Sequence, residues 1–147
     1  MILRLTPARA PEARQLAGIV HGWSEEVPFM PPPDSPAADA AALASLIDRG
    51  GVTVARRWHR PLGFIACEGE VIQGLYVTPS ARGEGVGRRL LDAAKAEAET
   101  LVLWCFEENH GARRFYAREG FTEVAASHGA GNDQRLPDVK LRWERKD

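Results

Sequence analysis

The fold of this chain is decided by residues 75–91, which run Leu75-Tyr76-Val77-Thr78-Pro79-Ser80-Ala81-Arg82-Gly83-Glu84-Gly85-Val86-Gly87-Arg88-Arg89-Leu90-Leu91. The apolar, β-branched and aromatic residues of 72–77 suit a buried strand, and Pro79 then stops sheet pairing because proline cannot donate a ladder hydrogen bond. Alternate glycines at 83, 85 and 87 let backbone N–H groups converge where a helix begins, and a helix N-terminus favours anions. With arginines on both sides, this stretch predicts a phosphate or diphosphate site.

Three kinds of phosphate loop can be compared with these glycines. A P-loop ends in Gly-Lys-Ser/Thr, whereas this chain has Gly87-Arg88-Arg89, and a dinucleotide fingerprint started at Gly83 or Gly85 lacks its third glycine. The pattern that fits is Arg-x-x-Gly-x-Gly at 82, 85 and 87, which resembles the coenzyme A pyrophosphate loop of the GNAT family of N-acetyltransferases. A structural glycine-rich turn that only caps the helix is the alternative for a lone Gly-x-Gly.

A second stretch, residues 109–121, is similar to another segment of the same family. It runs Asn109-His110-Gly111-Ala112-Arg113-Arg114-Phe115-Tyr116-Ala117-Arg118-Glu119-Gly120-Phe121 and resembles the pattern Asn-x-x-Ala-x-x-Phe-Tyr-x-x-x-Gly-Phe. With both segments in the family's order, the resemblance covers about residues 52–143. The first fifty residues carry little of it.

Local patterns predict the order β-α-α-β-β-β-α-β-α-β-β, an α+β (mixed α/β) chain. Strands are expected over 2–5, 52–57, 62–67, 71–77, 101–106, 121–125 and 139–143. Helices are expected from Thr6-Pro7, from Ser35-Pro36 to Gly50-Gly51, from 86 to near Thr100, and from 112 to 120. The continuously apolar run 101–106 predicts a strand buried on both faces, and Trp58-His59-Arg60-Pro61 predicts a turn through its proline.

Length and composition favour one domain over residues 1–147, since 44% hydrophobic and 27% charged residues are ordinary globular values. The net charge of −1 provides no basic field for nucleic acid or an anionic membrane. The N-terminus lacks a signal-peptide pattern, and Cys67 and Cys105 both lie in apolar runs as expected of reduced core thiols. A cytoplasmic protein is therefore expected, with a homodimer left open.

The resemblance implies a GNAT fold, a mixed, mostly antiparallel sheet of about six to seven strands flanked by about four helices, with a splayed cleft between the fourth and fifth strands. It implies transfer of the acetyl group of acetyl-CoA to a primary amine, with no metal. The coenzyme's arm would pair with the backbone of Leu75, Tyr76 and Val77 and contact Asn109. Its diphosphate would be bound by the loop residues Arg82, Gly83, Glu84, Gly85, Val86, Gly87 and Arg88.

The chemistry requires a neutral amine and a proton for the departing thiolate. The resemblance makes Tyr116 that acid, and direct attack is expected because no cysteine or serine has a visible base partner. Family members often place a carboxylate where this chain has Gln73 and Gly74, neither of which accepts a proton at neutral pH. The base therefore stays unassigned among Glu68, Glu70, His21, Glu25 and Glu26.

The acceptor amine is not identified by the sequence. Trp23, Phe29, Met30 and the proline run are expected to form one wall of its pocket, and residues 129–133 with Leu136-Pro137-Asp138 the other, since long loops in compact domains are often functional. Two other functional classes stay open. One is an acyl-CoA-binding sensor without turnover, suggested by the missing carboxylate, and the other is a structural or interaction module.

Overall fold

The computed structural model describes residues 2–26, 36–130 and 135–146, with the side chains of Glu25 and Pro36 excepted. Its strands are β1 Arg4–Pro7, β2 Val52–Arg57, β3 Arg60–Glu68, β4 Val71–Val77, β5 Thr100–Phe106, β6 Thr122–Ser127 and β7 Asp138–Glu144. Its α-helices are α1 Ala13–Glu26, α2 Pro36–Asp48, α3 Val86–Ala96 and α4 His110–Arg118, with 3₁₀ turns η1 Ala10–Glu12 and η2 Pro79–Ala81. The predicted order of strands and α-helices is confirmed.

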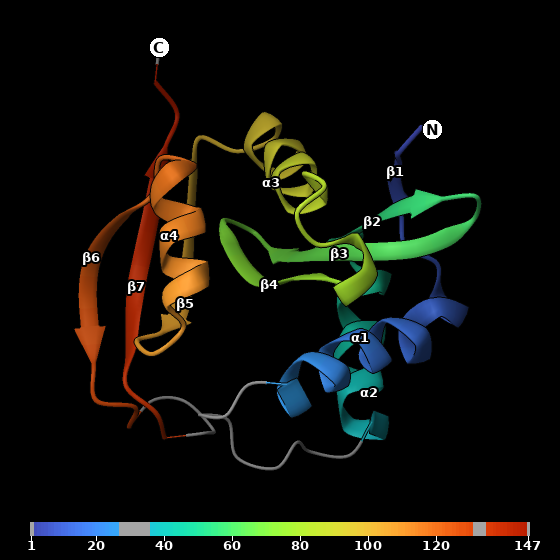
Figure 1. Ribbon diagram of the computed structural model, residues 1–147, viewed down its shortest axis with the longest axis horizontal. Helices are drawn as coiled ribbons and strands as arrows, with labels where there is room; N and C mark the ends of the chain where they lie inside the picture. The colour runs from blue at the N-terminus through green and yellow to red at the C-terminus, as the bar shows by residue number, and fades with distance from the viewer. Residues whose placement is uncertain (1, 27–35, 131–134, 147) are drawn as a thin grey trace.

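The strands form one seven-stranded sheet in the order β1-β2-β3-β4-β5-β7-β6. Every neighbouring pair is antiparallel except β4 and β5, which are parallel. Helices α1 and α2 lie together on one side of β2–β4, whereas α3 lies on the opposite side and α4 lies over β5–β7 (Figure 1). The predicted α+β fold, mixed sheet and four helices are confirmed. None of the helices in the described ranges is long and apolar enough to cross a membrane.

Two hydrophobic clusters hold these layers together, one on each side of the sheet. Leu16 of α1 packs with Val54 and Phe64 in the cluster under α1 and α2. Leu90 and Leu101 belong to the larger cluster under α3 and α4. The side chains at these positions are almost completely buried, so burial of apolar area accounts for most of the stability of both layers.

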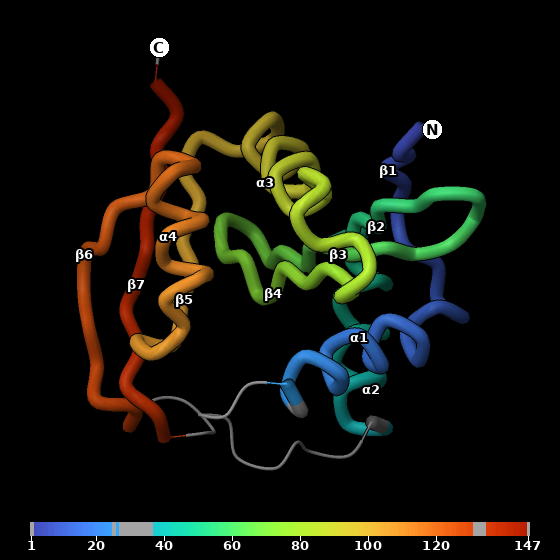
Figure 2. Tube along the Cα trace, in the orientation of Figure 1, coloured from blue at the N-terminus to red at the C-terminus, as the bar shows by residue number. Residues whose placement is uncertain are grey.

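A β-bulge lies in β4 where it pairs with β3, close to the point at which β4 and β5 diverge. On β4, Gly74 is in register with Ala66 and Ile72 with Cys67, so Gln73 is an extra residue without a partner on β3. A bulge bends its strand and increases the local twist. After the single register pair Val71↔Val102, β4 and β5 diverge, and Figure 2 shows them running in clearly different directions. The splayed opening expected between the fourth and fifth strands is therefore present.

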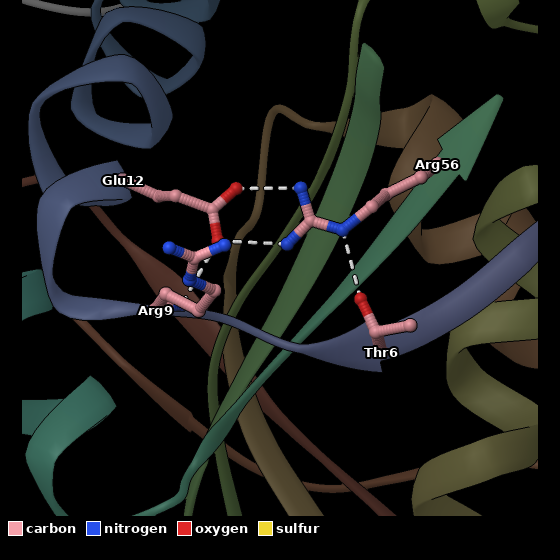
Figure 3. A network of polar contacts seen from close by, with 4 residues as sticks. All are labelled: Thr6, Arg9, Glu12 and Arg56. Atoms are coloured by element: carbon pink, nitrogen blue, oxygen red, sulfur yellow. Dashed lines mark hydrogen bonds and ion pairs between the residues drawn. The ribbon is translucent and has the colours of Figure 1, made fainter. Parts of the chain in front are cut away.

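The start of the chain differs from the prediction. Thr6 and Pro7 belong to edge strand β1 instead of beginning a helix, and proline is tolerated there because an edge strand has one unpaired side. The helical segment begins instead with η1, where Arg9 N–H donates to Glu12 at 2.9 Å. Figure 3 shows that Arg56 of β2 makes two hydrogen bonds to the Glu12 carboxylate and one to Thr6 Oγ1. This network fixes η1, and hence the start of α1, to the sheet.

Other boundaries also differ. The hairpin turn between β2 and β3 is formed by Trp58 and His59, both with positive φ, and Pro61 lies inside β3. Helix α3 ends at Ala96, four residues before Thr100, and α4 starts at His110 because Asn109 caps it. The prediction that β5 is buried on both faces is wrong: its burial alternates, and Trp104 is 49% exposed because α1 and α2 cover β2–β4 and not β5.

Candidate active site

The divergence of β4 and β5 opens a cleft of about 1430 Å³. Its walls come from α1, α2, β4, the loop before α3, β5 and α4, so it joins segments from both sides of the sheet. Eleven of the twelve residues that the sequence assigned to the site line it: Leu75, Tyr76, Val77, Arg82, Gly83, Gly85, Val86, Gly87, Arg88, Asn109 and Tyr116. The twelfth, Glu84, is not among the lining residues and pairs instead with Arg57 at 2.9 Å.

The glycine loop has the backbone geometry of an anion site. Gly83 and Gly85 have φ values of 79° and 83°, a left-handed conformation that favours glycine, and Gly85 is the N-cap of α3. The N–H groups of the first turn, residues 86–88, have no partner within a helix and point along its axis toward the loop. Together with the positive end of the helix dipole, they form a site for negative charge at the mouth of the cleft.

The arginines around this loop differ in what they contact. Arg82 donates through Nη1 to Glu26 of α1 at 2.7 Å and through Nε to the Val77 carbonyl at 3.2 Å, so it bridges the loop, β4 and α1. The Arg88 side chain is 70% exposed and lies 3.8 Å from Glu119. Arg88 is therefore the more available of these two cations for a phosphate at the surface, whereas Arg82 is already paired.

The cleft side of β4 carries backbone groups that the sheet does not use. Val71 is in register with Val102, and beyond it the described residues of β5 supply no register partner for β4. Backbone N–H and C=O groups are obligatory hydrogen-bonding groups, so residues 72–77 can pair with an extended ligand as a further strand.

Two of the lining residues of the cleft, Tyr116 and Asn109, belong to α4 and its N-cap. Tyr116 is buried, with its ring packed edge-on against Phe115 and Phe121 at centroid distances of 5.1 and 5.2 Å. Burial raises the pKa of Tyr116 above its usual value, so its phenol keeps its proton at neutral pH. Asn109 Oδ1 accepts a hydrogen bond from Ala112 N–H at 3.2 Å, which caps α4 and fixes the helix relative to the cleft.

Both cysteines are free thiols in core positions. Burial raises the pKa of Cys67 and of Cys105 to about 11, so neither is a thiolate at neutral pH. Cys105 lines the cleft, yet its protonated state makes it a poor nucleophile. Within the described ranges, no three His, Cys, Asp or Glu side chains gather where they could hold a metal ion.

A model of the GNAT acetyltransferase domain matches residues 48–123 of this chain, which include β4, the glycine loop, α3 and α4. This chain belongs to the GNAT family. It is an acetyltransferase, as the family model and relatives named N-acetyltransferases show.

Two relatives and one further structure illustrate the similarity. An uncharacterized N-acetyltransferase of Archaeoglobus fulgidus is 33% identical over 58% of this chain and 69% of its own length. The peptidyl-lysine N-acetyltransferase YjaB of Escherichia coli is 37% identical over 57% of each chain, and its apo solution structure superposes with a TM-score of 0.75 at 25% identity over 97% of this chain and 98% of that one. A PaiA N-acetyltransferase of Thermoplasma acidophilum, crystallised with coenzyme A, has the same fold, with a TM-score of 0.74 and 15% identity over 99% of this chain and 100% of that one.

This GNAT chain has no carboxylate at the β4 bulge, and the candidate bases fall in different places. Glu68 forms an ion pair with Arg49, and neither Glu68 nor Glu70 is among the residues that line the cleft. Glu26 lines the cleft but is paired with Arg82. His21 has its Nε2 4.0 Å from Asp39 Oδ2. The side chain of Glu25 lies outside the described residues.

The expected acceptor walls are described only in part. Trp23 lines the cleft, whereas Phe29, Met30, Pro31-Pro32-Pro33 and residues 131–133 lie outside the described residues. The described ends of the second loop, 127–130 and 135–138, are not among the lining residues. Asp138 instead is buried and accepts a hydrogen bond from Ser127, which joins β6 to β7.

The sequence reasoning missed several residues that line the cleft. Asp39 of α2 and Ser24 of α1 line the cleft, as do Trp104 and Phe106 of β5. Asp39 lies in the first turn of its helix, where the helix dipole alone explains an acidic residue, so its position in the sequence did not mark it. Trp104 and Phe106 are alternate residues of an apolar run, and the sequence did not distinguish them from the buried residues of the same strand.

Proposed function

We propose that this chain transfers the acetyl group of acetyl-CoA directly to a primary amine, and that the amine is a lysine side chain of a peptide or protein. The observation that carries the proposal is the cleft itself, which brings the unpaired side of β4, the anion-binding loop and Tyr116 into one space. The name of YjaB as a peptidyl-lysine N-acetyltransferase supports the choice of acceptor.

Binding of the coenzyme would divide between two backbone surfaces. The pantetheine arm would pair with Leu75, Tyr76 and Val77 on the side of β4 that β5 leaves unpaired. The diphosphate would accept hydrogen bonds from the amides of the glycine loop and the first turn of α3, with Arg88 as an additional cation. Asn109 would contact the arm from α4.

The transfer would proceed in one displacement. The lone pair of the neutral amine attacks the thioester carbonyl, a C–N bond forms, the C–S bond breaks, and the thiolate takes a proton from the Tyr116 hydroxyl. The excess proton of the amine leaves to solvent, and the Tyr116 hydroxyl regains its own proton from solvent. Direct attack is favoured over an acyl-enzyme because Cys67 and Cys105 remain protonated at neutral pH.

Three further properties are proposals drawn from the sequence. Residues 1–147 form one domain, the protein is cytoplasmic, and it binds neither nucleic acid nor membranes. The two free cysteines support a reducing compartment, and the net charge of −1 supports the choice of partners. A homodimer stays a prediction for sedimentation measurements.

The test is thiol release from acetyl-CoA with a panel of amines that contains lysine peptides, free alkylamines and arylamines. We expect thiol release that depends on the amine, with the acetylated amine recovered by mass spectrometry. Binding of acetyl-CoA without release by any amine would instead favour the sensor alternative, which the named relatives do not support. Absence of any stabilisation by acetyl-CoA would revive the interaction module.

A further inference from the structure

The α1 and α2 side of the cleft carries an aromatic and an acidic side chain, Trp23 and Asp39. Trp23 of α1 and Tyr76 of β4 meet edge to face, with ring centroids 5.7 Å apart and planes at 69°. Asp39 of α2 lines the same cleft, and its side chain is 29% exposed. Trp23 and Asp39 lie outside the family-matched residues 48–123.

Gly74 decides where the Tyr76 ring lies. A Cβ built at Gly74 would stand 2.6 Å from Tyr76 Cε2, so the ring occupies the space that any larger residue at 74 would need. The Phe64 ring also packs against it, with ring centroids 5.6 Å apart. The position at which the resemblance leads one to expect a carboxylate is therefore covered by an aromatic ring.

Among the residues that the structure describes, three carboxylates line the cleft, and they differ in their partners. Glu26 is paired with Arg82 at 2.7 Å, and Glu119 lies 3.8 Å from Arg88 and 3.9 Å from Lys95. Asp39 has His21 Nε2 at 4.0 Å, beyond hydrogen-bonding distance. The negative charge of Asp39 acts on the cleft, since it adds to burial in raising the pKa of Tyr76 to about 12.

We propose that Asp39 and the rings of Trp23 and Tyr76 form the subsite that receives the protonated amine of the acceptor, so that Asp39 selects alkylammonium acceptors over neutral arylamines. A carboxylate and aromatic rings are groups that recognise an ammonium ion, and the rings of Trp23 and Tyr76 are both half-buried. This inference rests on the proposed function, because it names the acceptor-binding residues of that same reaction. Asp39 is a specificity residue in this scheme and takes no proton from the amine, whose ammonium proton passes to solvent before the neutral amine attacks the thioester.

Steady-state kinetics can distinguish whether Asp39 binds the ammonium ion or acts as a general base. Stabilising the ammonium form favours binding but holds the amine in its unreactive state, so removing the charge should raise KM without lowering kcat. Loss of a general base should instead lower kcat by about 10²-fold or more.

The experiment compares Asp39→Asn with Asp48→Asn, a matched change at the exposed last residue of the same helix. Thiol release is measured with a lysine peptide and with an arylamine that is neutral at the assay pH. For Asp39→Asn we expect KM for the lysine peptide to rise about tenfold, with kcat and the KM values for arylamine and acetyl-CoA within about twofold. Asp48→Asn should match the wild type. An unchanged lysine KM, an equal rise for both amines, or a large fall in kcat would overturn the proposal.

A binding measurement separates failure of this inference from failure of the proposed function. An alkyltrimethylammonium ion carries the charge of the acceptor but cannot be acetylated, so its affinity is measured by calorimetry whether or not the enzyme turns over. We expect binding to the wild type and to Asp48→Asn, weakened about tenfold in Asp39→Asn. Equal binding to all three proteins, or binding to none, contradicts the subsite, whereas absence of turnover with normal cation binding contradicts only the proposed function.

Discussion

The two walls of the cleft are built in different ways. The wall that we propose binds the coenzyme, called the coenzyme wall, consists of β4, the glycine loop, α3 and α4, all within the family-matched residues 48–123. Its chemistry is carried mainly by backbone N–H and C=O groups that glycines and a helix N-terminus leave unpaired. The wall that we propose binds the acceptor, called the acceptor wall, lies on α1 and α2 and has side chains such as Trp23 and Asp39, from two helices that pack together. The glycine loop depends on glycines at fixed spacing within one segment, whereas Trp23 and Asp39 come from two different helices and have no fixed spacing.

The largest expected effect comes from placing a negative charge in the coenzyme wall. Gly87→Asp should fold, because a Cβ there would lie 3.6 Å from Phe115, an ordinary contact, and an acidic residue in the first turn suits the helix dipole. The added carboxylate repels the diphosphate, so the affinity for acetyl-CoA should fall about 100-fold or more. The measurement is the shift in melting temperature that acetyl-CoA produces.

The matched control is Gly18→Asp, at an exposed position of α1 where a Cβ meets nothing within 4 Å. It adds the same charge to the other side of the molecule and should keep the full stabilisation by acetyl-CoA. If acetyl-CoA stabilised Gly87→Asp fully as well, the diphosphate would have to bind elsewhere, and the glycine loop would not be part of a coenzyme site.

The next effect concerns the hydroxyl proton of Tyr116, which lies in α4 and lines the cleft. Tyr116→Phe keeps the ring packed between Phe115 and Phe121 and removes only the hydroxyl. We expect kcat to fall by roughly 10²-fold with acetyl-CoA affinity nearly intact, since the proton matters only in the transition state. Because burial raises the pKa of this phenol, wild-type kcat should not decline through loss of the Tyr116 proton between pH 7 and about pH 9.

Removal of the chain's other tyrosine hydroxyl provides the comparison. Tyr76→Phe keeps the ring over Gly74, so its effect on kcat should be less than tenfold. Equal losses in the two variants, measured where chemistry limits the rate, would show that Tyr116 has no special role in protonating the thiolate.

The contrast between the walls also explains what the sequence could predict. The order of strands and helices followed from periodicity and turn residues. The glycines at 83, 85 and 87 predicted the loop that lines the cleft before α3, because backbone geometry restricts which residues fit there. The start of α1 was misplaced because Thr6-Pro7 has the pattern of a helix start, and only the contact of Arg56 with Thr6 and Glu12 shows why the chain stays in β1. Asp39 could not be assigned, since its role depends on packing against distant residues.

A smaller effect concerns the free energy of unfolding. It tests how the hydrogen bonds between Arg56 and Glu12 attach η1, and hence α1, to the sheet. The hydrogen bond from Arg56 lowers the pKa of Glu12 below its ordinary value of 4.5, more than burial raises it, and the backbone N–H of Arg9 lowers it further. A lowered pKa in the folded state contributes stability that is complete above the unfolded pKa and is lost as the pH falls through the folded one. Glu12→Gln should therefore cost about 1–3 kcal/mol at pH 7, and its difference from the wild type should close as the pH falls below about 4.

Urea denaturation at several pH values measures this difference. Glu144→Gln is the control, because the Arg142–Glu144 pair is exposed and should contribute little at any pH. Stabilisation by acetyl-CoA should persist in Glu12→Gln, since the network holds η1 and α1 and not the glycine loop. A pH-independent loss of stability would instead indicate that Glu12 acts through packing.

The most direct test of a coenzyme wall made of backbone is amide NMR during titration of the whole chain with acetyl-CoA. We predict the largest chemical-shift changes for the amides of 83–88 and 74–77, together with Asn109 and Tyr116, and small changes in η1 and β1. The same titration of Gly87→Asp should leave those amides unmoved at matched concentrations. Large changes confined to residues outside the cleft, with 83–88 unaffected in the wild type, would contradict the account.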